Sequence, residues 1–249
     1  MEMRITSRKN SYLQQVKKLL SSRKERESAG LFVSDGTKLL QEAVRYYPGL
    51  ETVILTDGIQ AQVPEHVKVI RVPEDVMASI SPMETPQGAL FVCRMPEKKA
   101  FVPSAPMLLL DGIQDPGNLG TILRTADAMN VKVALLEGCA DPYSHKVVRA
   151  SMGAVLRCDV VQTTWEEARE ALKAAGIPVA VTALSDRARD IRQADVANMA
   201  VVIGSEGQGV RREVLDSADA ELIIPMNDHC ESLNAAIAAA IVMWQMEQV

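Results

Sequence analysis

Apolar positions in the first 96 residues change period several times, which is typical of a compact α/β unit. The expected helices are residues 11–26, a stretch with Leu39, Leu40, Ala43 and Val44 on one face, and residues 73–80. The expected strands are residues 31–36, 52–57, 67–72 and 88–94.

From residue 107 onward, short apolar runs alternate regularly with amphipathic stretches. The apolar runs predict strands at residues 107–111, 131–137, 159–164, 178–184, 199–204 and 220–226. The stretches between them predict helices at residues 118–130, 144–156, 165–176 and 232–249. Such alternation indicates a mostly parallel sheet covered on both faces, with ligands bound at the carboxyl ends of its strands.

Residues 97–106 separate the two patterns and predict a linker. The surrounding segment, residues 95–106, holds three prolines and two lysines and has no period. We therefore expect an N-terminal domain over residues 1–96 and a second domain over residues 107–249.

The composition, 47% apolar and 24% charged, is that of an ordinary globular protein. No apolar run approaches the roughly 20 residues of a membrane span, and the N-terminus lacks the apolar core of a signal peptide. We expect a cytoplasmic protein without membrane contact. The four cysteines form no CxxC pair and do not cluster with the three histidines, so no metal site is expected.

The charge distribution indicates a candidate nucleic-acid surface. Residues 1–30 hold eight Lys/Arg and three Glu, a net charge of +5, whereas the whole chain carries −5. A basic arm on an acidic body can contact phosphates, although a solvated amphipathic helix would give the same pattern. The candidate RNA-binding residues are Arg4, Arg8, Lys9, Lys17, Lys18, Arg23, Lys24 and Arg26.

Polar or glycine-rich segments follow three of the expected strands. After residues 107–111, Pro116-Gly117-Asn118 predicts a turn in which Asn118 caps the next helix. Arg124 follows within that helix, where a permanently charged guanidinium suits an anion, although a solvated helix surface is the alternative. The second segment, residues 201–210, has three glycines around Glu206 and lets the backbone approach a ligand closely.

The third segment, residues 223–241, contains a polar loop and then an alanine-rich helix that Ser232 or Glu231 is expected to cap. This helix is either buried in the core or packed against a partner subunit. His145 and His229 are candidate bases, but a lone histidine is more often structural.

Together and in this order, three segments resemble the signatures of the SpoU/TrmH RNA methyltransferases. They read DGIQDPGNLGTILRTADA, IGSEGQG and IPMNDHCESLNAAIAAAI. The N-terminal half is also similar to the domain that often precedes the catalytic domain in that family. The resemblance implies a SPOUT fold, a parallel α/β sheet with a deep C-terminal trefoil knot, preceded by a small L30e-like α/β domain that grips RNA. It also implies a homodimer formed through the C-terminal helix and the knot region.

By this resemblance the protein uses S-adenosyl-L-methionine (AdoMet) to methylate a ribose 2′-hydroxyl in RNA, with ribosomal RNA favoured. The implied catalytic residues are Arg124, Asn118, Glu206, Ser232 and Asn234. The implied cofactor-binding residues are Gly204, Ile224, Leu233, Gly207, Met226 and Thr182. The alternatives are a transfer RNA 2′-O-methyltransferase, a non-catalytic RNA-binding protein, and a small-molecule enzyme that binds a nucleotide at the glycine-rich loop.

Overall fold

The computed structural model describes residues 2–227, 229–230 and 232–247, and the chain forms two compact units. Unit 1 contains the residues up to Glu97 together with Asp141–Arg157, and unit 2 contains Lys98–Ala140 and the residues from Cys158 onward. The sequence assigned residues 141–157 to the second domain, whereas their contacts group them with the first unit. No helix among the described residues is long and apolar enough to cross a membrane.

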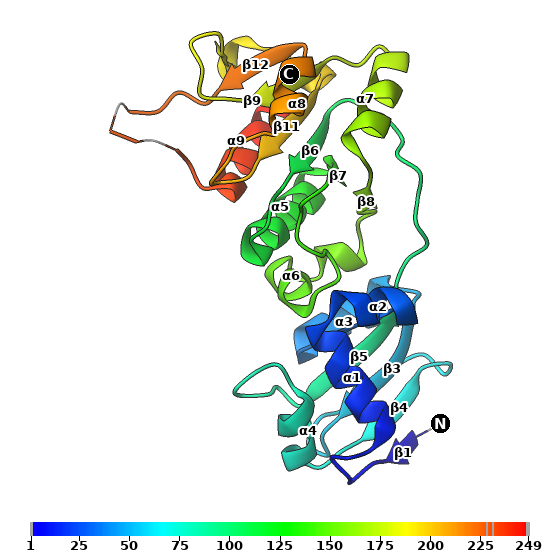
Figure 1. The fold of residues 1–249 in the computed structure, drawn as a ribbon. Coiled ribbons are helices and arrows are strands. Elements are labelled where there is room, and N and C mark those ends of the chain that lie inside the picture. The colour runs from blue at the N-terminus through cyan, green and yellow to red at the C-terminus, as the bar shows by residue number, and fades with distance from the viewer. Residues whose placement is uncertain (1, 228, 231, 248–249) are drawn as a thin grey trace. The chain divides into compact units, whose positions relative to one another are not determined.

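Unit 1 is built on a five-stranded sheet in the order β1-β4-β3-β5-β2. Figure 1 labels β1, β3, β4 and β5 of this sheet. Its strands are β1 (Glu2–Arg4), β2 (Leu31–Asp35), β3 (Leu50–Leu55), β4 (Lys68–Arg71) and β5 (Ala89–Arg94). Strand β5 is antiparallel to both neighbours, and the other pairs are parallel. The helices between these strands are α1 (Ser11–Ser21), α2 (Arg23–Ala29), α3 (Thr37–Tyr46) and α4 (Glu74–Ile80).

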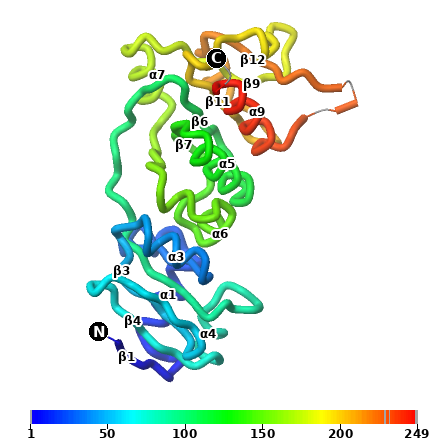
Figure 2. The backbone as a smooth tube through the Cα atoms, turned by 180° about the vertical axis from the view of Figure 1, so that it is seen from behind, coloured from blue at the N-terminus to red at the C-terminus, as the bar shows by residue number. Residues whose placement is uncertain are grey.

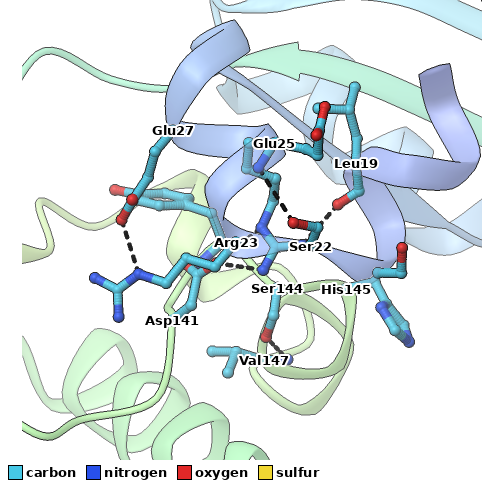
Figure 3. Close-up of polar contacts among 12 residues, drawn as sticks. Leu19, Ser22, Arg23, Glu25, Glu27, Asp141, Ser144, His145 and Val147 are labelled. Carbon is cyan, nitrogen blue, oxygen red and sulfur yellow. Dashed lines mark hydrogen bonds and ion pairs between the residues drawn. The ribbon is translucent and has the colours of Figure 1, made fainter.

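The single helix expected over residues 11–26 is wrong, because the chain breaks at Ser22. Ser22 has extended backbone angles, ends α1, and accepts a hydrogen bond on its side chain from the Glu25 amide (Figure 3). A serine in extended conformation satisfies an amide that the first turn of a helix leaves without a partner. The apolar face of α1, which includes Leu13, Val16 and Leu19, packs in the core of unit 1 as its spacing predicts.

Residues 141–157 contribute α6 (His145–Ala150) and a short 3₁₀ helix, Ala154–Leu156, to unit 1. The helix expected over residues 144–156 is therefore too long. Ser144 caps α6 through the Val147 amide (Figure 3), and the helix ends before Met152, which has a φ of 50°. A left-handed backbone conformation cannot continue a right-handed helix, and it is strained at a residue with a bulky side chain such as methionine.

Unit 2 is a seven-stranded parallel sheet in the order β10-β12-β9-β11-β6-β7-β8, which confirms the predicted parallel α/β architecture. Its strands are β6 (Met107–Asp111), β7 (Lys132–Leu135), β8 (Val161–Gln162), β9 (Val179–Thr182), β10 (Arg189–Asp190), β11 (Ala200–Gly204) and β12 (Ala220–Ile223). Its helices are α5 (Pro116–Met129), α7 (Trp165–Ala174), α8 (Arg212–Ser217) and α9 (Ala235–Glu247). The sequence pattern missed β10 and α8, which have two and six residues.

Helices cover both faces of this sheet. Met107 and Leu109 of β6 share a core cluster with Trp165 of α7 and Val214 of α8. Alternate residues of a strand point to opposite faces. On the other side, α9 packs against α5 and β11, and Figures 1 and 2 both show α5 beside α9. All five residues of β6 are buried, which explains their unbroken apolar character up to Asp111.

Candidate functional site

A cavity of about 440 Å³ lies in unit 2 at the carboxyl ends of β9, β11 and β12. Its walls come from residues 182–185 at the end of β9, residues 203–210 at the end of β11, Leu215 of α8, residues 222–226 at the end of β12 without Pro225, and the residues around the start of α9. The six residues expected to bind the cofactor all line it. Segments that are far apart in the sequence therefore meet where the sequence placed a ligand.

The segment from Gly204 to Val210, here called the glycine loop, folds back on the end of β11. Ser205 and Gly209 exchange two backbone hydrogen bonds, of 3.1 and 2.9 Å. A Cβ atom on Gly204 would lie 2.1 Å from the carbonyl carbon of Gly209, which is closer than any real side chain tolerates. Gly204 is thus required because the returning backbone occupies the space of a side chain.

For the methyl transfer from AdoMet that the resemblance implies, we expect Gly204→Ala to lower the rate by about a hundredfold and to weaken AdoMet binding, because an added methyl group must displace the loop by roughly an ångström. Steady-state rates and AdoMet affinity measured together would check this. Gly58→Ala is the matched control, since a Cβ at Gly58 meets no atom within 4 Å. Normal AdoMet affinity in Gly204→Ala would contradict the prediction.

Three polar side chains from the three signature segments form one hydrogen-bonded chain. The Asn234 Nδ2 donates to the Asn118 Oδ1 at 2.9 Å, and the Asn118 Nδ2 donates to the Glu206 carboxylate. The Asn234 Oδ1 accepts from the amides of Ala236 and Ile237, at 2.9 and 3.2 Å. Because a carboxylate only accepts, the direction of every bond in the chain is fixed.

Two helix caps differ from the sequence prediction. The side chain of Asp115, not that of Asn118, caps α5, and it accepts from the Asn118 amide at 2.7 Å. Asn234, not Ser232, caps α9; the alternative cap, Glu231, lies outside the described residues. The first correction matters for the site, because Asp115 leaves the Asn118 side chain free to join Glu206 to Asn234.

The remaining catalytic candidates do not enter this chain. Ser232 lines the cavity, and its side chain is exposed. Arg124 is exposed on α5 and makes no hydrogen bond or ion pair with any residue that the structure describes. A guanidinium with five donors and no partner in the described part of the chain is available for an anionic ligand.

The model of the SpoU rRNA Methylase family matches residues 105–244, more than half of the chain. The chain belongs to this family. A second model, the MRM3-like substrate binding domain, matches residues 10–90. The resemblance of the three signature segments is thereby confirmed at the level of the family.

Similar proteins extend over the full length of this SpoU family member. It is 35% identical over 248 residues to the 23S rRNA (guanosine(2553)-2′-O)-methyltransferase RlmP of Bacillus subtilis, covering 97% of this chain and 98% of RlmP. The structure of an AdoMet-bound rRNA methyltransferase from Sinorhizobium meliloti matches with a TM-score of 0.87 and 27% identity, over 99% of this chain and 98% of that chain. The SpoU methyltransferase AviRb from Streptomyces viridochromogenes, in complex with AdoMet, matches with a TM-score of 0.82 and 25% identity, over 96% and 98% of the two chains.

The basic N-terminal residues divide into three groups. Arg26 is buried, with 4% exposure, and pairs with Asp141 at 2.6 Å, so its assignment to an RNA-binding surface is wrong. The exposed arginines pair with carboxylates of unit 1: Arg4 with Asp57, Arg8 with Asp75 and Arg23 with Glu27. The exposed lysines have no carboxylate partner among the described residues: Lys9, Lys17, Lys18 and Lys24.

Neither histidine lies in the cavity wall. The His145 Nδ1 lies 3.2 Å from the carbonyl oxygen of Leu20 in unit 1, and burial lowers the pKa of His145 although that hydrogen bond opposes the shift. His145 is therefore interpreted as a structural residue on α6 (Figure 3). His229 is exposed in the loop that follows β12.

Sequence reasoning missed Arg211, which follows the glycine loop. Its backbone amide and its Nε donate to the two carboxylate oxygens of Asp111, at 2.8 and 2.6 Å. Its Nη2 donates to Glu137 at 2.6 Å, and its Nη1 lies 2.8 Å from Glu213. Burial opposes the charged forms, yet these bonds raise the pKa of Arg211, and bonds from the backbone and from Arg211 lower the pKa of Glu137. The sequence feature that could have indicated this ion pair is Asp111, a charged residue at the end of a buried strand, because a buried charge needs a partner.

Proposed function

We propose that this protein transfers a methyl group from AdoMet to a ribose 2′-hydroxyl of ribosomal RNA. The observation that carries the proposal is the chain from Glu206 through Asn118 to Asn234, which joins the three signature segments at the edge of the cavity. The full-length similarity to RlmP, whose name states this reaction on 23S rRNA, supports the substrate class.

The cavity fits the proposed methyl donor. Its volume of about 440 Å³ lies in the range of small-molecule sites. Leu222, Ile224 and Leu233 offer apolar surface for the adenine ring, and the backbone of the glycine loop offers hydrogen-bonding groups. AdoMet would supply a methyl group on a positively charged sulfur, which leaves as a neutral thioether when the 2′-oxygen forms its bond to the methyl carbon.

The residues of this chain would position the acceptor. In this proposal Arg124 holds the RNA phosphate and stabilises negative charge that develops on the 2′-oxygen. Arginine is a poor base because its pKa is above about 12, so we assign it no proton transfer of its own. The polar chain of Glu206, Asn118 and Asn234, with Ser232 beside it, would orient the ribose and Arg124.

The proposal includes the finer features of the family's fold. The glycine loop and α9 would form part of the trefoil knot, supported by the packing of α9 against both α5 and β11. Helix α9 would also form the homodimer, since Ile237 and Trp244 are 52% and 57% exposed on it. Unit 1 would be the L30e-like RNA-binding domain. Because its proposed substrate is ribosomal RNA, the protein would act in the cytoplasm.

The exposed lysines of α1 give a prediction for RNA binding. We expect the double variant Lys17→Ala, Lys18→Ala to bind RNA more weakly and to reduce the slope of log affinity against log salt by about 0.7 for each phosphate that is no longer neutralised. Filter binding at several salt concentrations would measure this. Lys132→Ala, an exposed lysine of unit 2, is the control. An unchanged slope would exclude these two lysines from the RNA surface.

The test of the function is methyl transfer from labelled AdoMet to total ribosomal RNA and, separately, to total transfer RNA. We expect label in ribosomal RNA alone, confined to one alkali-resistant dinucleotide, which marks a 2′-O-methyl group. Label in transfer RNA alone would show that the substrate is transfer RNA and not ribosomal RNA. AdoMet binding without transfer to either pool would contradict both assignments, and absence of AdoMet binding would leave a non-catalytic RNA-binding protein.

A further inference from the structure

Arg211 joins the carboxyl ends of three neighbouring strands in unit 2. Strands β11, β6 and β7 lie side by side in that order. Arg211 follows β11 after the glycine loop, Asp111 is the last residue of β6, and Glu137 lies two residues after β7. One guanidinium therefore contacts carboxylates at the ends of β6, which is next to β11, and of β7, which is the next strand beyond β6.

The contact with Asp111 closes the glycine loop into a ring. In the pairing of β6 with β11, Asp111 lies opposite Gly204, the first residue of the loop. Its carboxylate then accepts from both the amide and the Nε of Arg211, directly after Val210, the last residue of the loop. The two ends of the loop are thus tied to the same residue of β6.

Burial makes this closure strong. The Asp111 side chain has 0% exposure, whereas that of Arg211 has 35%. A buried carboxylate needs all of its hydrogen bonds, because an unpaired buried charge is strongly destabilising. Arg211 satisfies both oxygens of Asp111, so displacement of the loop end would leave that charge without these two donors.

We propose that Arg211 is a positioning residue that holds the glycine loop in its AdoMet-binding conformation through Asp111 and Glu137. Arg211 does not line the cavity, so it acts through the loop and not by contact with the methyl donor. The inference rests on the proposed function, since it concerns the same cavity. It assigns a role to a residue outside the expected site.

The test compares Arg211→Ala and Arg211→Lys with Arg212→Ala in the full-length protein. We expect Arg211→Ala to raise the Kd for AdoMet, measured by calorimetry, by on the order of tenfold or more. Arg211→Lys should restore part of the affinity, because it keeps a cation but loses the fork. RNA affinity should not change. Arg212→Ala is the matched control: its side chain is 83% exposed and pairs only with Asp216, one turn later, among the described residues.

A second variant covers the case in which Arg211→Ala does not fold. Glu137→Gln removes one arm of the clamp at a carboxylate that is 42% exposed, and it should raise the Kd for AdoMet in the same direction by a smaller factor. A purely structural role would lower the active fraction and leave the Kd and the KM for AdoMet unchanged, and that result in either variant would overturn the proposal. Wild-type protein that fails to bind AdoMet would instead refute the proposed function.

Discussion

Arg124→Ala should lower the rate of methyl transfer to RNA by about 10²–10³-fold while leaving the Kd for AdoMet unchanged. Arg124 is exposed on α5, without a partner among the described residues, and it does not line the cavity. Its charge can therefore serve the RNA phosphate and the developing oxyanion, and its removal should not disturb cofactor binding. Single-turnover rates with labelled AdoMet, together with calorimetric AdoMet binding, measure both quantities.

Arg124→Lys separates charge from shape. Lysine keeps the positive charge but cannot contact a phosphate with two parallel donors, so we expect a rate between those of the wild type and Arg124→Ala. A wild-type rate in Arg124→Ala would exclude the residue from the reaction. A clear fall in AdoMet affinity would instead assign it to the cofactor site.

The strands of unit 2 could be predicted because the physical cause is local. A strand buried on both faces, such as β6, reads as an unbroken apolar run, and the amphipathic stretches between such runs read as helices. The missed elements, β10 and α8, are too short to establish a period. The break at Ser22 was missed because apolar residues continue at helical spacing up to it, while the cap that starts α2 depends on one side chain.

The residues of the cavity wall could be named from the family's motifs, but their local roles could not. Asp115 and Asn118 are both good caps, and the expected one, Asn118, is not the one that caps α5. Pro116 contained the missing signal: proline favours the first position of a helix, which makes residue 115 the cap. Ser232 and Asn234 present the same choice at α9 without a proline to decide it.

Arg26 shows what a sequence pattern cannot contain. Its place among seven other basic residues predicted an exposed, RNA-binding side chain. Its partner, Asp141, is 115 residues away and belongs to the segment that joins unit 1 from the catalytic half of the sequence. Only the tertiary fold brings the two together.

Arg26→Ala should therefore destabilise unit 1 by about 3–5 kcal/mol, the usual cost of leaving one charge of a buried pair alone. The side chains of Arg26 and Asp141 are 5% and 10% exposed, and Arg26 also donates to the carbonyl oxygen of Leu19 at 2.6 Å. Hydrogen exchange read by mass spectrometry resolves the destabilisation by segment. Relative to the wild type, we expect the exchange rate to increase more in α1, α2 and α6 than in the sheet of unit 2. Arg23→Ala is the matched control, because the Arg23–Glu27 pair is exposed and such pairs contribute about 0–1 kcal/mol (Figure 3).

A double variant distinguishes removal of the pair from removal of one partner. If the cost of Arg26→Ala comes from the unpaired Asp141 carboxylate, Arg26→Met combined with Asp141→Leu should restore much of the stability, since apolar side chains of similar volume can replace a buried ion pair. If the losses of stability in the single variants Arg26→Met and Asp141→Leu add up to that of the double variant, the two residues are not coupled. A double variant that is stable and binds RNA normally would also confirm that Arg26 stabilises the core of unit 1 and does not contact the RNA.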